Sequence, residues 1–263
     1  DKPSQLSGIA SFYNYGAARA WEERSLPIGT GSFGGNILGS IAAERITLNE
    51  KTLWRGGPNT SKGADYYWNV NKESAHLLPE IRQAFVDNDL EKAAKLTREN
   101  FNSLAQYEDY NEKPFRFGSY TTMGEAYIET GLSEIGVSDY KRILSIDSAL
   151  AVVTFQKDGV KYERTYFASY PDSAMVWKFT ADKPGMQNLT FSYTTNPEAE
   201  GKMVADGEKG LLYVGKLKNN NMEFALRIQA KHKGGSVKST ADGKLVAKGA
   251  DEVIFEYEHG DAK

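Results

Sequence analysis

The sequence predicts a mainly β protein, an antiparallel sandwich or barrel that is interrupted by one short helical insertion. Three observations carry this prediction. Apolar and polar residues alternate with a period of two through the second half of the chain, turns containing Gly, Pro or Asp recur at short intervals, and one segment near residues 73–101 has helical periodicity instead. Many short strands joined by tight turns are typical of sandwiches and barrels.

Two stretches in the last fifth of the chain show the alternation most clearly. In both, every second residue is apolar and the residues between are charged or polar, as expected of a half-buried strand. The apolar members are Phe224, Leu226, Ile228 and Ala230 in the first stretch, and Val253, Phe255 and Tyr257 in the second. We expect these side chains to face the core.

A tight hairpin is predicted at Asp158-Gly159. The alternating stretch 151–155 leads into this pair, and the stretch 160–167 returns from it. Asp-Gly favours the positive φ angles that a type I′ turn requires, so the pair is a strong signal for a two-residue hairpin loop.

Residues from about 73 to 101 are predicted to form the helical insertion, in two pieces. Pro79 suits the first turn of the first helix, and Asn88-Asp89-Leu90-Glu91 resembles a capping box that begins the second. The apolar faces are Ile81, Ala84 and Phe85 in the first helix, and Leu90, Ala93, Ala94 and Phe101 in the second.

The composition is that of a globular protein of 263 residues, with 40% hydrophobic and 25% charged residues. The formal charge is −3, and the 32 basic residues are interspersed among 35 acidic ones, so no basic stripe predicts binding to nucleic acid or to an anionic membrane. No apolar run approaches the roughly 18 residues of a membrane-spanning helix. The chain has no cysteine, which excludes disulfides and thiolate metal sites.

The most specific motif lies in residues 26–58. It contains Leu26-Pro27-Ile28-Gly29-Thr30-Gly31 and, later, Asn49-Glu50-Lys51-Thr52-Leu53-Trp54-Arg55-Gly56-Gly57-Pro58. These residues resemble the opening of family 95 glycoside hydrolases, the α-L-fucosidase type. The resemblance continues in 117–120, 140–142 and 167–172 and covers most of the chain. Thr30 departs from the family's usual Asn, and residues 121–125 are a loose version of its Gln-Pro-Leu-Gly-Asp pattern.

The resemblance implies a large antiparallel β super-sandwich as a single N-terminal domain over residues 1–263. In that family a helical (α/α)₆ barrel follows the sandwich and holds the catalytic residues, a general-acid Glu with Asn and Asp residues that position water for inverting hydrolysis. The implied reaction is hydrolysis of terminal α-L-fucosyl or α-L-galactosyl linkages. We expect the barrel to be absent from this chain, so that no catalytic residue can be assigned and the fragment is inactive alone.

Partners and location follow from the same resemblance. The implied partners are the protein's own C-terminal catalytic barrel and, through the parent enzyme, fucosylated glycans. The implied location is outside the cytoplasm of a bacterium, in the periplasm, on the cell surface or secreted.

Four residues of the motif, Asn49, Glu50, Trp54 and Arg55, are the candidates for a substrate cleft or a domain interface. Glu50 could line the cleft of the parent enzyme, or it could bind backbone amides of the turn that follows. Trp54 could stack on a sugar ring with Arg55 bonding hydroxyl groups beside it, or it could be wedged between the sandwich and the barrel. Either way, this loop is the expected face toward the missing domain.

The sequence predicts neither a cofactor nor a metal site. Its three histidines, His76, His232 and His259, are widely separated and lack ligand spacing. The glycines of residues 29–34 fit GxGxxG superficially but lack a βαβ context, which favours a glycine-rich turn.

Two other functions compete with the accessory-domain hypothesis. An independent carbohydrate-binding module would bind glycans through aromatic side chains without a second domain. An enzyme in its own right, such as a sugar epimerase on a related super-sandwich, would need His and Glu side chains converging on one sheet, which the scattered histidines disfavour.

Overall fold

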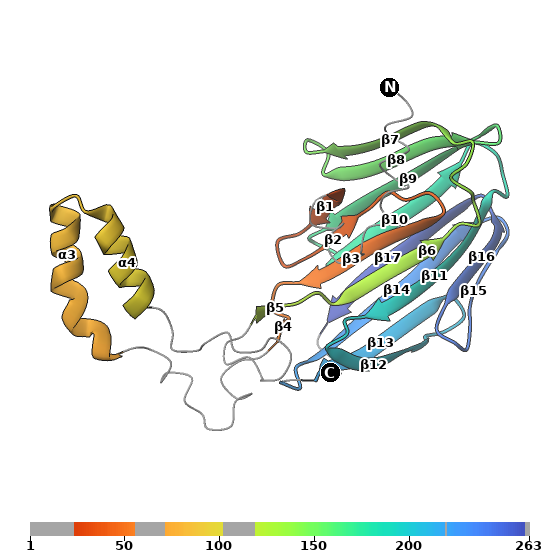
Figure 1. Cartoon of the computed structure of the whole chain (residues 1–263). Helices are drawn as coiled ribbons and strands as arrows, with labels where there is room; N and C mark the ends of the chain where they lie inside the picture. The colour runs from red at the N-terminus through yellow and green to blue at the C-terminus, as the bar shows by residue number, and fades with distance from the viewer. Residues whose placement is uncertain (1–23, 56–71, 102–118, 219, 261–263) are drawn as a thin grey trace. The chain divides into compact units, whose positions relative to one another are not determined.

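The computed structural model describes residues 24–55, 72–101, 119–218 and 220–260 (Figure 1). The chain divides into two compact units. One, Asp1–Leu53 with Tyr120–Lys263, contains a β-sandwich, and the other, Trp54–Ser119, contains the helices. The single domain over residues 1–263 stays a prediction. Within the described residues, no helix is long and apolar enough to cross a membrane.

The first sheet of the sandwich has seven strands, and each neighbouring pair is antiparallel. In spatial order they are β1 (Leu26–Gly29), β2 (Phe33–Ile37), β3 (Ala43–Glu50), β6 (Gly124–Glu129), β11 (Gln187–Thr195), β16 (Leu245–Ala250) and β15 (Ser236–Ser239).

The second sheet has eight antiparallel strands. In spatial order they are β12 (Ala199–Ala205), β13 (Gly210–Leu217), β14 (Glu223–Lys233), β17 (Glu252–Gly260), β10 (Ala174–Ala181), β9 (Val160–Ser169), β8 (Leu150–Lys157) and β7 (Ser138–Ser145). Two short strands, β4 (Trp54–Arg55) and β5 (Ser119–Tyr120), form a third sheet. The prediction of a mainly β sandwich with one helical insertion is confirmed.

Aromatic side chains fill the core between the two sheets. Trp177 of β10 is fully buried, with its ring centroid 6.4 Å from that of Phe191 on β11 and 6.1 Å from that of Tyr257 on β17. Phe191 also lies 5.6 Å from Phe255 of β17. Because Phe191 belongs to the first sheet and the others to the second, these contacts join the sheets.

The strands predicted from alternation are confirmed. All seven apolar residues expected to face the core in 224–230 and 253–257 are buried, in β14 and β17. The Asp158-Gly159 hairpin is confirmed as well, because it joins β8 to β9 with φ angles of 51° and 70°. Both residues thus occupy the left-handed region, as a type I′ turn requires.

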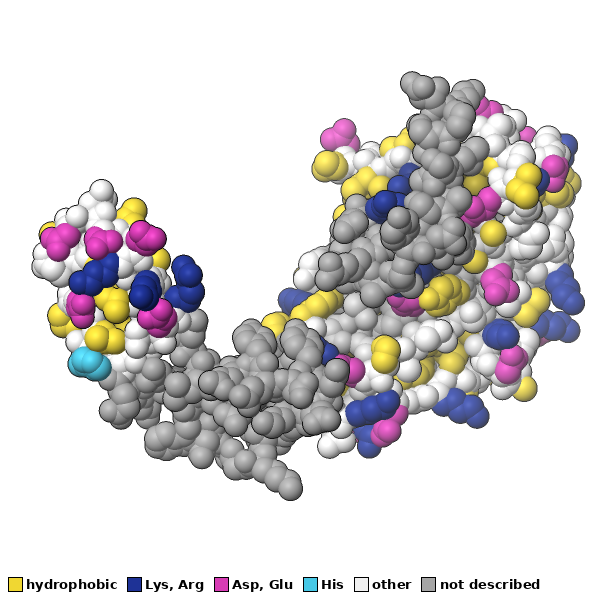
Figure 2. Space-filling view, viewed as in Figure 1, with side chains coloured by type: hydrophobic (Ala, Val, Ile, Leu, Met, Phe, Trp, Pro, Cys, Tyr) yellow, Lys and Arg dark blue, Asp and Glu magenta, His cyan; other side chains and the backbone are white. Residues whose placement is uncertain are grey.

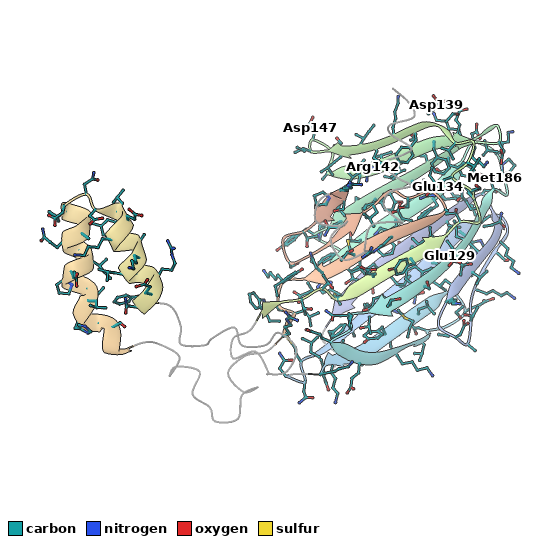
Figure 3. All side chains as sticks on the ribbon, viewed as in Figure 1. Glu129, Glu134, Asp139, Arg142, Asp147 and Met186 are labelled. Carbon is teal, nitrogen blue, oxygen red and sulfur yellow. The ribbon has the colours of Figure 1, made fainter. Side chains whose placement is uncertain are left out.

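A buried loop, residues 38–42, joins β2 to β3 at the end of β3 opposite Glu50. Side chains donate hydrogen bonds to its carbonyl oxygens one after another. A carbonyl buried without a hydrogen-bond partner would cost folding free energy, so these bonds stabilise the loop. The donors are Arg142 (labelled in Figure 3) to Leu38, Tyr140 to Gly39, Arg164 to Ser40 and Ile41, and Thr130 to Ile41 and Ala42. Tyr140 and Arg142, from the motif at 140–142, therefore hold this loop against the second sheet.

A buried ion pair beneath the loop connects the sheets. Glu44 of β3 is fully buried and lies 3.3 Å from Nη1 of Arg164 on β9, which is 3% exposed. Tyr166 of β9 donates to the same carboxylate at 2.7 Å. Burial, and then the charge of Glu44, raise the pKa of Tyr166 well above 10, so this hydroxyl remains a donor.

The second unit contains a 3₁₀ turn, η2 (Lys72–Leu77), and the helices α3 (Leu78–Val86) and α4 (Leu90–Asn100). Pro79 lies in the first turn of α3, as predicted. Asp89 is the N-cap of α4 and accepts from Lys92 N at 3.0 Å. The predicted capping box is wrong in one respect, because Lys92 stands at the third helical position, where a reciprocal box needs Glu or Gln.

The predicted apolar faces of the two helices are only partly buried. Ile81, Ala84 and Ala93 are buried, whereas Phe85 is 59% and Leu90 57% exposed. Two short helices packed on each other cover only the side chains that lie directly between them. The apolar stripes are real features of the sequence, but much of their surface is not covered in this structure.

Candidate functional site

The four candidate residues lie where β3 ends and the chain turns toward β4. Asn49 and Glu50 are the last residues of β3 and pair with Gly34 and Phe33 of β2. At Gly34 an added Cβ would lie 2.7 Å from the carbonyl oxygen of Ile28 on β1 and 3.5 Å from Oδ1 of Asn49. The absence of a side chain at Gly34 therefore allows the backbone of β1 to approach, and Asn49 would meet a Cβ there only at ordinary contact distance.

Glu50 binds the turn that follows it. Its Oε2 accepts from the backbone N of Thr52 at 2.9 Å and also from the Thr52 hydroxyl. Lys51 N donates to Ser32 O at 2.8 Å, and Leu53, which is 2% exposed, anchors the turn in the core. The hydrogen bond to a backbone amide is the second of the two roles expected for Glu50, and a role in a substrate cleft stays a prediction.

Trp54 and Arg55 form β4, at the start of the helical unit. The Trp54 side chain is 46% exposed, which is unusual for so large an apolar group. Residues 56–58, the last of the motif, lie outside the described residues. Sugar stacking by Trp54 and hydroxyl binding by Arg55 stay predictions.

An aromatic cluster lies beneath Glu50 in the sandwich. Phe33 packs against His259, with centroids 4.4 Å apart, and His259 stacks on Tyr257 at 6.3 Å. Burial, with smaller effects of Tyr193 and Glu50, raises the pKa of Tyr257 well above its usual value. Its hydroxyl lies 3.0 Å from the sulfur of Met123.

The segment that leads into β6 is fixed beside this cluster. Asn196 donates to Thr121 Oγ1 and to Thr122 O, the latter at 2.8 Å, and Tyr193 donates to Met123 O at 2.7 Å. Gly124 has a φ of 141°, and an added Cβ would lie 2.4 Å from Thr194 O. Only glycine fits there, which explains why the loose motif at 121–125 retains this residue.

The chemistry available at this end is hydrogen bonding to polar groups. Tyr120, which is 41% exposed, has its pKa raised by burial and by the charge of Glu50, so its phenol remains protonated and can donate. Glu50 can accept. Among the described residues, no group of three His, Asp or Glu side chains could hold a metal ion.

Sequence reasoning missed Asn196, Tyr120 and His259 as parts of this end. For His259 a signal existed, because it continues the inward alternation of Val253, Phe255 and Tyr257. For Asn196 there was none, since its partners at 121 and 122 lie about 75 positions away in the sequence.

Comparisons with known proteins agree on the family. The model of the family described as "Glycosyl hydrolase family 65, N-terminal domain" matches residues 13–259. The chain is 27% identical to "Alpha-L-fucosidase 2" of Arabidopsis thaliana, over 91% of this chain and 29% of that protein. It is 30% identical to "Probable alpha-fucosidase A" of Aspergillus niger, over 69% of this chain and 22% of that protein.

The chain thus spans less than a third of the length of these curated relatives. The family model covers most of the sandwich, and the names of the relatives match the fucosidase-type resemblance found in residues 26–58. The chain belongs to the glycosyl hydrolase family 65 N-terminal domain family, and it is the N-terminal domain of a fucosidase-like glycoside hydrolase.

Proposed function

We propose that this chain is a non-catalytic domain that supports the catalytic barrel of a fucosidase-like hydrolase and lends the loop at Asn49–Arg55 to the substrate cleft. One observation carries the proposal. The chain aligns over 91% of its length with a protein named alpha-L-fucosidase 2, yet this alignment leaves about 70% of that protein unmatched. The catalytic barrel belongs in the unmatched part.

The contacts of three carboxylates in the sandwich support a non-catalytic role for them. Glu44 is neutralised by Arg164, Glu125 is bound by Arg45 and Tyr127, and Glu50 is bound by the turn after it. Inverting hydrolysis needs two carboxyl groups about 6.5–9.5 Å apart with water between them. Carboxylates held by structural hydrogen bonds are poorly suited to activating that water.

The proposed reaction of the whole protein is hydrolysis of terminal α-L-fucosyl or α-L-galactosyl linkages. The names of the plant and fungal relatives support fucosyl substrates. Bacterial origin and export from the cytoplasm remain parts of the proposal that rest on the sequence resemblance alone.

Kinetics of the full-length protein test the role of the loop. We expect Trp54→Ala to lower kcat/KM for a fucosylated oligosaccharide by roughly fivefold, since a stacked ring contributes on the order of 1 kcal/mol. Glu50→Gln keeps an oxygen for the Thr52 amide but removes the charge, so it separates cleft binding from support of the turn. Tyr170→Ala is the control, because this side chain is 76% exposed on the β9–β10 turn.

Unchanged kcat/KM in both loop variants would contradict a place in the cleft. The isolated chain tests the alternative, an independent binding module. Saturation transfer from the chain to the fucose protons of a trisaccharide, lost in Trp54→Ala, would favour that module instead.

A further inference from the structure

The α3–α4 hairpin exposes several large apolar side chains. Only Ile81, Ala84 and Ala93 are buried within it. Four exposed apolar side chains are here called the hairpin patch: Leu78 (39% exposed), Phe85 (59%), Leu90 (57%) and Phe101 (38%); Val86 (78%) is also exposed but is not counted in the patch. Figure 2 shows hydrophobic side chains between charged ones on the visible face of this unit.

The hairpin patch follows helical geometry. Leu78 and Phe85 are seven residues apart, two turns of α3, and therefore lie on one face of it. Leu90 is the first residue of α4, and Phe101 is the C-cap residue that follows its last turn. In α3 the exposed side chains thus flank the buried Ile81 on the same apolar face.

Helices of this length are not stable by themselves. The helices α3 and α4 have 9 and 11 residues, below the ~12–15 at which even Ala-rich helices become marginal in water. Stability of such helices comes from packing an apolar face against another surface. Contiguous exposed apolar side chains generally mark an interaction surface.

We infer that the hairpin patch docks on an apolar surface of the catalytic part of the same, longer protein. This inference rests on the proposed function. The insertion leaves the sandwich just after Leu53 and rejoins it at Tyr120, next to Glu50 and to the backbone hydrogen bond from Met123 N to Leu48 O, 2.9 Å long. It is thus tethered at the end that the proposed function turns toward the catalytic part.

The length of the relatives supports this occupant. About 70% of the length of the plant fucosidase lies outside the matched region. A segment of that length has enough surface to cover a small helical hairpin. Among the described residues, the core cluster of the sandwich is formed by side chains of the sandwich unit.

Hydrogen exchange of the α3 and α4 amides, measured by mass spectrometry, tests the docking. We compare the full-length protein with the 263-residue chain, each as wild type and as the double variant Phe85→Ala/Leu90→Ala. Val86→Ala is the matched control, because Val86 is 78% exposed but about 100° around the helix from Phe85. Alanine favours helix, so faster exchange cannot come from intrinsic propensity.

We expect these amides to exchange on the order of 100-fold more slowly in the full-length protein than in the chain, about tenfold for each large side chain covered. The double variant should lose most of this protection, and Val86→Ala should keep it. Equal exchange in the two proteins would overturn the inference. Protection that is already present in the isolated chain and lost in the double variant would also overturn it, because the patch would then pack on the sandwich. Protection that rises with dimer formation would overturn it as well.

The docking and the proposed function fail separately. Release of fucose by the wild-type full-length protein reports the function, and hydrogen exchange reports the docking. Fucose release without protection of the hairpin amides would contradict only the docking. Protection of these amides without fucose release would contradict only the proposed function.

Discussion

Replacing Arg164 by Met should destabilise the sandwich more than any surface ion pair could. The guanidinium is 3% exposed, binds Glu44 and the carbonyls of Ser40 and Ile41, and lies 5.2 Å from the ring centroid of Phe155. Methionine fills much of the same apolar volume but supplies no donor. The variant therefore removes the charged partner of the buried Glu44 carboxylate and this donor to the Ser40 carbonyl, whereas the Ile41 carbonyl keeps the hydrogen bond from Thr130 at 2.8 Å.

The size of the effect follows from what remains around Glu44. Removing one partner of a buried ion pair costs about 3–5 kcal/mol. The Glu44 carboxylate keeps three donors, from Gly39 N at 2.7 Å, Arg45 N at 3.1 Å and Tyr166 OH at 2.7 Å, which lowers the cost. The lost hydrogen bond to the Ser40 carbonyl raises the cost again, by ~1 kcal/mol. We expect about 4 kcal/mol in total.

Urea unfolding of the 263-residue chain, followed by the fluorescence of tryptophan, measures this cost, because Trp177 is fully buried in the core. The control is Arg227→Met, which breaks the exposed 2.6 Å ion pair with Asp206 and should cost at most ~1 kcal/mol. Adding Glu44→Gln to Arg164→Met should recover about 1–3 kcal/mol through coupling. An Arg164→Met cost no larger than that of the control would refute the reasoning.

Three further predictions concern the site end and the surface of the sandwich. Gly124→Ala should cost at least ~2 kcal/mol in urea unfolding, because its φ of 141° and the close Thr194 carbonyl exclude a Cβ; Gly131→Ala, which has open space, should cost ~1 kcal/mol. Asn196→Ala should speed hydrogen exchange in residues 121–124 and cost about 1–3 kcal/mol, since it leaves buried acceptors unpaired. Hydrogen bonds from Lys178 and Lys233 lower the pKa of Glu252. The stabilisation that the charged Glu252 gives is therefore present above about pH 4.5 and is lost as the pH falls through the lowered pKa. Glu252→Gln should make the free energy of unfolding fall less steeply at acidic pH.

The sequence was informative wherever a local pattern decides the structure. Alternation placed Phe224 and Tyr257 in the core, and the chemistry of Asp158-Gly159 determined its turn, because each depends on neighbours within a few residues. The role of Glu44 could not be predicted. Its partner Arg164 is 120 positions away, and a carboxylate in a strand is usually solvated rather than paired.

The candidate site was predictable in part. The motif located Asn49 and Glu50, and the hydrogen bond from Thr52 N to Glu50 was among the roles considered, because a carboxylate two residues before an amide can reach it. The clamp by Asn196 was not predictable, since it depends on how β11 and the start of β6 meet. The exposure of Phe85 also escaped prediction, because periodicity shows that a face is apolar but does not show what covers it.

Fucose release is the most direct test of the central claim, that this domain supports catalysis without performing it. The same α-L-fucosylated trisaccharide is incubated with the full-length protein and with the 263-residue chain, and free fucose is measured. We predict release by the full-length protein and none by the chain. Release of fucose by the chain alone would contradict the account, because it would place the catalytic residues within these 263 residues.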